Sequence, residues 1–295
     1  MTLFLDCRLS PVGGGLASHV SINQGTNIAD YGGVSLNGLQ NAIQGRDVLI
    51  ATHGFNVNRS DGIDCLSNWE SLLQPHPFPG FVGLLWPGDS VWAHGLDYPE
   101  EPRIANEAGS LIAGFIDDNF QRAASISFAS HSLGARVVLA TISHLRLPVR
   151  RVVLMAGAID DNCLTTEFKA VASNIGSISI LASREDEVLS VCFPLGNFFA
   201  GIIAEGHPWW RAALGHCGPA KPWPASFQAP FEIPDIWNFE HGNYLQIDTP
   251  SPPAFALPVN VPPRGSLPPK LDPAGKPIQG WQEAFSSAFA STRFR

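Results

Sequence analysis

This sequence of 295 residues has few charged side chains: 15% of its residues, against roughly 25% in an average globular protein. Its formal net charge is −8, and no run of lysine and arginine is longer than Arg150 followed by Arg151. Binding the phosphate backbone of a nucleic acid needs a basic patch, so we expect no nucleic-acid partner. No stretch approaches the ~20 apolar residues of a membrane span, so we predict no transmembrane segment.

Cysteines are also few, and the five are widely separated: Cys7, Cys65, Cys163, Cys192 and Cys217. Their number is odd and none forms a Cys-x-x-Cys pair, which argues against a metal site and against a disulfide framework. Buried thiols in a reducing cytoplasm are the simpler interpretation. Residues 1–8 lack a basic region followed by a long apolar stretch, so they indicate a first strand rather than a secretory signal. We therefore expect a cytoplasmic protein.

What the sequence does contain is an alternation of two apolar patterns. Short apolar runs between turn residues predict buried strands over residues 48–51, 81–86, 126–128, 152–155 and 178–181. Apolar residues at helical spacing predict helices over residues 36–43, 104–120, 133–145, 167–175 and 188–199. Strands that alternate with helices pair in parallel and carry helices on both faces. We predict an α/β fold with a mostly parallel central sheet and with the chemistry at the carboxyl ends of its strands.

The C-terminal part differs from the rest in its proline content. Ten of the 25 prolines lie between residues 249 and 277, a density that favours an extended, polyproline-like chain. A short helix with Trp281, Phe285 and Phe289 on one face is predicted to follow. We expect one domain over residues 1–248, with a lid or pocket wall at about 188–220. The arm over residues 249–295 is expected to pack on that domain.

One short sequence points to a catalytic turn. Residues 130–134 read Ser-His-Ser-Leu-Gly and lie between a predicted strand and a predicted helix. A sharp strand-to-helix turn through small-x-Ser-x-small is the layout of a nucleophile elbow, which holds Ser132 in a strained conformation above the sheet. Ser130 stands where the common pattern has glycine, and His131 is expected to point away from the site. The alternative is an ordinary turn with incidental serines.

A catalytic serine needs a base beside it and an acid that orients the base. For the acid, the sequence offers Asp186, with Glu185 and Glu187 as neighbouring rivals and Asp160 and Asp161 as second choices. We prefer Asp186, because a shorter side chain at a turn is easier to hold rigid. A helix N-terminus favoured by the helix dipole is a second interpretation of the acidic cluster.

The predicted base is His241, because serine, aspartate and histidine then occur in the chain order typical of this arrangement. His207 and His216 remain rivals. The reaction also needs backbone N–H groups directed at the developing oxyanion. One is expected from the residue after the nucleophile, Leu133, and the other from Phe55, in the loop that follows strand 48–51.

Aromatic side chains near these residues predict an apolar pocket, suited to an acyl chain or an aromatic ester. The residues assigned to it are Trp86, Trp92, Phe198 and Phe199, with His53 beside them as a hydrogen-bonding group of its loop. The alternative for Phe198 and Phe199 is packing of a helix on the sheet.

Taken together, these residues resemble those of alpha/beta-hydrolases, and more narrowly those of a bacterial branch of largely uncharacterised, esterase-like members. The resemblance extends from about Arg46 to Tyr244 and includes segments 52–56, 85–89 and 131–136. Segments 156–160, 183–189 and 241–244 also carry it. It implies Ser132 as nucleophile, Asp186 as acid and His241 as base.

We therefore expect a serine hydrolase that cleaves a carboxylic ester of a small molecule through an acyl-enzyme and needs no cofactor or metal. Amidase, thioesterase or acyltransferase chemistry with the same three residues stays open. The alternative from another class is a non-catalytic member that keeps the fold for binding or as a scaffold. The sequence leaves the oligomeric state undetermined.

Overall fold

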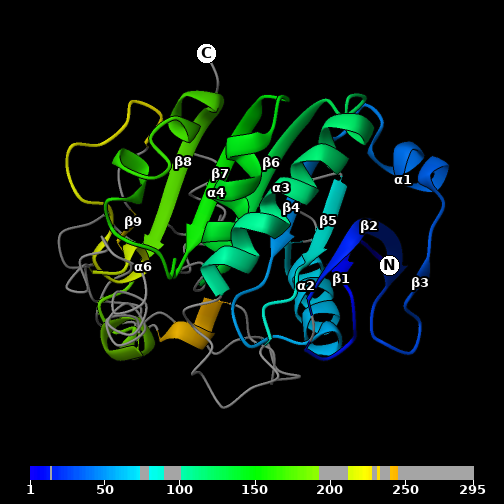
Figure 1. Cartoon of the computed structure of the whole chain (residues 1–295), viewed down its shortest axis with the longest axis horizontal. Helices are drawn as coiled ribbons and strands as arrows, with labels where there is room; N and C mark the ends of the chain where they lie inside the picture. The colour runs from blue at the N-terminus through cyan, green and yellow to red at the C-terminus, as the bar shows by residue number, and fades with distance from the viewer. Residues whose placement is uncertain are drawn as a thin grey trace, which may run out of the picture.

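The computed structural model describes residues 1–13, 15–73, 80–89, 101–192, 212–227, 231–232 and 240–244. These residues form one nine-stranded sheet in the order β3-β2-β1-β5-β4-β6-β7-β8-β9 (Figure 1). The strands are β1 (Thr2–Arg8), β2 (Leu16–Gly25), β3 (Gly32–Gly33), β4 (Asp47–Thr52), β5 (Gly80–Leu85), β6 (Ser125–His131), β7 (Val149–Met155), β8 (Ile175–Ala182) and β9 (Phe231–Glu232). Neighbours from β1 to β9 pair in parallel, while β2 and β3 add an antiparallel edge. The predicted α/β fold with a mostly parallel sheet is confirmed.

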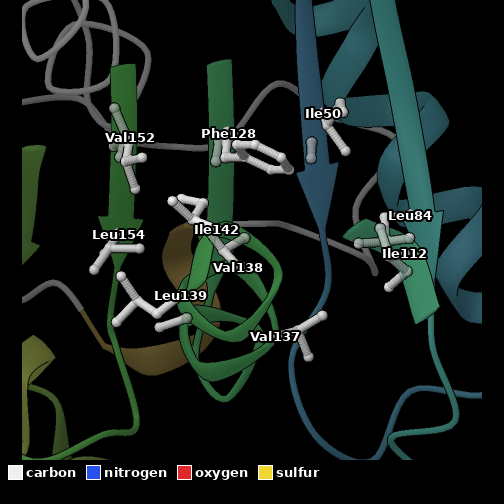
Figure 2. Close-up of a cluster of buried hydrophobic side chains, with 14 of the residues drawn as sticks. Ile50, Leu84, Ile112, Phe128, Val137, Val138, Leu139, Ile142, Val152 and Leu154 are labelled. Carbon is white, nitrogen blue, oxygen red and sulfur yellow. The ribbon is translucent and has the colours of Figure 1, made fainter. Parts of the chain in front are cut away.

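Helices cover both faces of this sheet. They are α1 (Leu36–Ile43), α2 (Arg59–Leu73), α3 (Glu101–Asn119), α4 (Gly134–His144) and the short α6 (Leu214–Cys217). Figure 1 shows α3 and α4 crossing the near face. On β5, the side chain of Leu85 contacts Gly62 of α2, whereas Leu84 points to the other face, where Figure 2 shows it beside Ile112 of α3. Helix α2 therefore packs on the face opposite α3 and α4.

The apolar core lies between α4 and the central strands. Figure 2 shows Leu139 of α4 together with Phe128 of β6 and Leu154 of β7, and all three are buried. Burying one such side chain contributes roughly 1.5–3 kcal/mol. Because both faces of the central strands are covered, β4 and β5 are nearly continuous apolar runs. Strands β6 and β8 also contain serines, which are small enough to be buried there.

The strand order reverses direction at β4, which places two loops together. From β4 the chain passes through α2 to β5 on one side, and then through α3 to β6 on the other side of β4. The pairing of Thr52 with Ser130 aligns the ends of β4 and β6. The loops that follow these two strands are therefore adjacent at the carboxyl edge of the sheet, the usual position of a ligand site in such folds.

The sequence predictions differ from the structure in several segments. The helix predicted over residues 167–175 is wrong: the chain forms turns and a short 3-10 helix, Val171–Asn174, and Ile175 already begins β8. Helix α2 and the antiparallel strand β2 were not predicted. The predicted first strand is confirmed as β1, and α1 has the predicted bounds.

Other predictions fall mainly outside the described residues. Of the helix predicted over 188–199, the structure describes a π-helix, Val188–Cys192. Most of the predicted lid and the whole arm over 249–295 lie outside the described parts. In the described parts, no helix has the length and apolar character needed to span a bilayer. Nor do those parts contain a group of three or more His, Cys, Asp or Glu residues able to hold a metal ion.

Candidate active site

Ser132 occupies a strained turn between β6 and α4. Its φ is 53°, in the left-handed region that side chains other than glycine rarely adopt. Backbone hydrogen bonds hold this conformation: the Ser132 N–H donates to the carbonyl of Met155 (2.9 Å), and the Ser132 carbonyl accepts from Ala135 and Ala158 (3.1 Å each). The residue is 6% exposed, so its hydroxyl sits at a nearly enclosed position.

Two glycines allow the elbow and the loop after β4 to approach each other. A Cβ on Gly54 would lie 2.7 Å from the Cβ of Ser132, and a Cβ on Gly134 would lie 2.5 Å from the carbonyl oxygen of His53. Both distances are too short for a contact between non-bonded atoms, so any side chain at Gly54 or Gly134 would push the two segments apart. Ser130, at the position where the elbow pattern has glycine, fits because it is small and is completely buried.

The structure brings together the three residues that the sequence suggested as a triad. Nε2 of His241 lies 2.9 Å from Oγ of Ser132, and Nδ1 of His241 lies 2.8 Å from Oδ2 of Asp186. Because an aspartate only accepts, Nδ1 carries the hydrogen, and Nε2 is left to accept the hydroxyl proton of Ser132. His241 belongs to the short 3-10 helix His241–Tyr244, drawn in orange in Figure 1 at the carboxyl edge of the sheet.

Asp186 is distinguished from its acidic neighbours by burial. Its side chain is fully buried, whereas Glu187 is exposed and Glu185 is partly exposed. The second carboxylate oxygen, Oδ1, accepts the backbone N–H of Leu189 at 3.0 Å, which fixes the plane of the carboxylate. Asp186 also contributes, after burial, to raising the pKa of the nearby Tyr244 hydroxyl well above its usual value.

The Leu133 N–H and the loop that carries Phe55 lie beside Ser132. In the described part of the chain, the Leu133 N–H donates to no protein acceptor, although Leu133 is 1% exposed. Phe55 lies in the loop that Gly54 brings against the elbow. The next residue, Asn56, has a left-handed φ of 57°, and its N–H donates to the carbonyl of Gly88 at 2.7 Å. The loop after β4 is thereby tied to the loop after β5.

His53 and Trp86, which the sequence assigned to the pocket, bind each other. Their rings stack with centroids 5.9 Å apart, and the indole N–H of Trp86 donates to the His53 carbonyl at 3.0 Å. Nδ1 of His53 donates to the carbonyl of Gly54 at 2.9 Å. Burial, with a smaller contribution from the cation of Arg8, lowers the pKa of His53 to about 4. His53 is therefore a neutral group that hydrogen-bonds within its loop, and contact of either residue with a substrate stays a prediction.

A buried ion pair holds together the loops that follow β4 and β5. The guanidinium of Arg8, at the end of β1, pairs with the carboxylate of Asp89 and is completely buried. It also donates to the carbonyls of Trp86 (2.8 Å) and Val57 (3.1 Å). This role of Arg8 was not predicted, because nothing near Arg8 in the sequence indicates a partner 81 residues away.

His131 was expected to point away from the site, but it contacts the residue that carries the base. Nε2 of His131 lies 2.8 Å from the backbone carbonyl oxygen of His241, and the two rings are 4.8 Å apart between centroids. Its position next to Ser132 was the only sequence signal for this contact. The other pocket residues, Trp92, Phe198 and Phe199, and the rival base His207 lie outside the described residues. His216 lies in α6.

The fold and the strained serine turn define an alpha/beta hydrolase. A family model confirms this class: the chain belongs to the family described as alpha/beta hydrolase of unknown function (DUF900), whose model matches residues 36–199, more than half of the chain. No curated protein sequence matches the chain.

Several solved structures are similar at low identity. An uncharacterised protein from Bacillus cereus ATCC 10987 is 20% identical over 55% of this chain and 49% of its own, with a TM-score of 0.35. A propionate-bound esterase from Thermogutta terrifontis is 12% identical over 69% of this chain and 76% of its own, with a TM-score of 0.35. Inhibited esterase B from Lactobacillus rhamnosis is 9% identical over 70% of this chain and 72% of its own, with a TM-score of 0.37. TM-scores this low add nothing to the family assignment.

Proposed function

We propose that this protein is a serine hydrolase that cleaves a carboxylic ester of a small molecule, with Ser132, His241 and Asp186 as its triad. The single observation that carries the proposal is the continuous chain of contacts from Asp186 through His241 to the Ser132 hydroxyl, with distances of 2.8 and 2.9 Å. These are hydrogen-bonding distances, so His241 can take the proton of the Ser132 hydroxyl while Asp186 orients its ring and remains ionised. The strained backbone of Ser132 in a hydrolase-family fold supports the same conclusion.

The reaction has two halves. In the first, Oγ of Ser132 attacks the ester carbonyl carbon while Nε2 of His241 takes the hydroxyl proton. The tetrahedral intermediate collapses, the carbon–oxygen bond to the alcohol breaks, and His241 returns the proton to that leaving oxygen. In the second half, His241 takes a proton from water, the resulting oxygen nucleophile attacks the acyl-enzyme, and the acid leaves as Oγ recovers its proton.

Two groups of donors and acceptors lower the barriers of these steps. Asp186, buried and fixed by the Leu189 N–H, holds the His241 ring in the correct tautomer and stabilises the imidazolium that forms. The N–H groups of Leu133 and Phe55 are proposed to bind the oxyanion. Loss of one such donor typically costs roughly 2.7–4 kcal/mol of transition-state stabilisation.

The test is covalent labelling with a fluorophosphonate probe. Wild-type protein should be labelled at Ser132, and Ser132→Ala should not be labelled, because the phosphorus forms its bond only with an activated serine oxygen. Ser130→Ala is the matched control and should be labelled like the wild type. A panel of p-nitrophenyl esters of increasing acyl length then measures substrate preference.

Absence of labelling in wild-type protein with a normal unfolding transition would overturn the proposal. A non-catalytic protein that keeps this fold for binding would then be the better interpretation. Labelling of a serine other than Ser132, identified by peptide mass, would also contradict it.

A further inference from the structure

The imidazole of His131 lies between the two loops that must meet at Ser132. On one side, a Cβ on Gly54 would lie 3.3 Å from Nδ1 of His131, so the loop after β4 packs directly on this ring. On the other side are the rings of His241, 4.8 Å away, and Tyr244, 5.9 Å away between centroids. His131 directly precedes Ser132 in the chain, so a contact that fixes His131 also restrains the position of Ser132.

The polar contact of His131 is with backbone and not with the reacting atoms. Its Nε2–H donates to the carbonyl oxygen of His241 at 2.8 Å. A carbonyl oxygen only accepts, so the hydrogen of the neutral ring is on Nε2. Burial, with repulsion from His241 next in size, lowers the pKa of His131 to about 3. The ring is therefore an uncharged donor at neutral pH and places no second cation beside the imidazolium formed during the reaction.

A tether of this kind is needed because His241 lies on a very short element. The 3-10 helix His241–Tyr244 has four residues, too few to be stable without outside contacts. The Asp186 contact fixes the ring of His241, and the completely buried Tyr244 anchors the other end of the turn, but neither contact is made by the backbone of His241 itself. The hydrogen bond from His131 fixes that backbone relative to Ser132.

We propose that His131 is a positioning residue, whose Nε2–H holds the backbone of the catalytic base at reacting distance from the neighbouring nucleophile. This inference rests on the proposed function, since it concerns the distance between Ser132 and His241. It adds a fourth side chain to the site, one that acts through His241 and touches no substrate.

The test uses three substitutions at one position in the full chain. In His131→Gln the side-chain amide nitrogen reaches as far as Nε2 and can donate to the same carbonyl. In His131→Asn the amide is one methylene shorter and cannot, and His131→Leu keeps the volume without any donor. We expect kcat for p-nitrophenyl acetate to fall about 10- to 100-fold in His131→Asn and His131→Leu, the usual effect of displacing a catalytic group by about 1 Å.

KM should change less than about 2-fold in these variants, because the tether does not contact the bound ester. His131→Gln should keep kcat within about 3-fold of wild type, a rescue that a purely structural role would not give. Thermal unfolding of each variant identifies any that fails to fold, and the Gln–Asn pair remains informative if His131→Leu is such a case.

Equal kcat values in His131→Gln and His131→Asn would overturn the inference, as would wild-type kcat in all three variants. These results differ from a failure of the proposed function, in which the wild type itself neither hydrolyses the ester nor reacts with a fluorophosphonate.

Discussion

Three residues other than glycine have a left-handed backbone in the described parts of the chain, and all three lie at the carboxyl ends of neighbouring strands. They are Asn56 (φ 57°) after β4, Ser132 (φ 53°) after β6 and Ala156 (φ 47°) after β7. Each such conformation costs about 1–3 kcal/mol and persists only where surrounding contacts enforce it. The backbone strain found in the described residues is thus concentrated at the candidate active site.

Ser130 lowers the stability of the protein in a different way. Its hydroxyl oxygen is buried and has no hydrogen-bond partner within the described residues. A buried, unpaired hydroxyl is destabilising, so we expect Ser130→Ala to raise the free energy of unfolding by about 1 kcal/mol. The measurement is a urea titration, with a matching rise in melting temperature of about 2 °C. A fall in stability would show that the hydroxyl has a partner.

At the scale of elements, the crossing of α3 over α4 depends on one glycine. A Cβ on Gly109 would lie 2.6 Å from the Cβ of Ala140 and 2.7 Å from the backbone nitrogen of Thr141, so the two helix backbones are in direct contact there. Gly114, five residues along α3, is exposed and has no atom within 4 Å of such a Cβ. Gly109 in the helix interface and Gly114 on the solvent side of the same helix can therefore be compared directly by the same substitution.

We expect Gly109→Ala to destabilise the protein by about 1–3 kcal/mol, because the helices must move apart. Gly114→Ala should stabilise it by about 0.5–1 kcal/mol, because alanine is the better helix former. Urea midpoints of both variants test this, and the idea of a close helix crossing fails if both substitutions change stability in the same direction.

The elements that sequence patterns predicted are those whose stability is local. Strands β4 and β5 are apolar runs because both of their faces are covered, and α1 has a serine N-cap, Ser35, just before its first apolar residue. The segment 167–175 misled the prediction because Phe168, Val171, Ala172 and Ile175 have helical spacing. Pairing of Ile175 with Val149 then extends β8 into this segment, so tertiary contact overrode local pattern.

The candidate site divides in the same way. Ser132, Asp186 and His241 were predictable because a serine turn, an acidic loop and a late histidine follow a known chain order. The contacts of Arg8 with Asp89 and of His131 with the carbonyl of His241 were not, because no known motif or chain order links these residues across the 81 and 110 positions that separate them. Helix α2 had a usable signal, the buried stripe Ile63, Leu66 and Trp69, in an otherwise polar sequence.

At the scale of the whole molecule, His53 makes stability depend on pH. The folded protein protonates His53 only near pH 4, because burial lowers its pKa from the ordinary 6.5 to about 4. Between those values the unfolded chain binds more protons, so stability is complete above pH 6.5 and falls as the pH decreases towards 4. The loss from this residue is about 3 kcal/mol.

Urea unfolding of wild type and His53→Asn at pH 7 and pH 4.5 measures this loss as the difference between the two proteins, because His131, whose pKa is lowered to about 3, contributes equally to both. His53→Asn places a neutral amide donor where Nδ1 was, so its stability should fall less between the two pH values than that of the wild type. The same substitution at exposed His19 is the control and should leave the difference unchanged. If all three proteins lose equal stability, His53 is not the group responsible.

The contact between Ser132 and His241 joins residues 109 positions apart, and that between Asp186 and His241 joins residues 55 apart. Chains are synthesised from the N-terminus, and β8, the last long strand among the described residues, is complete at Ala182, well before His241. Ser132 is therefore made early and meets His241 late. If the triad acts as proposed, a chain still on the ribosome can assemble most of its sheet without being able to react with acyl compounds in its surroundings.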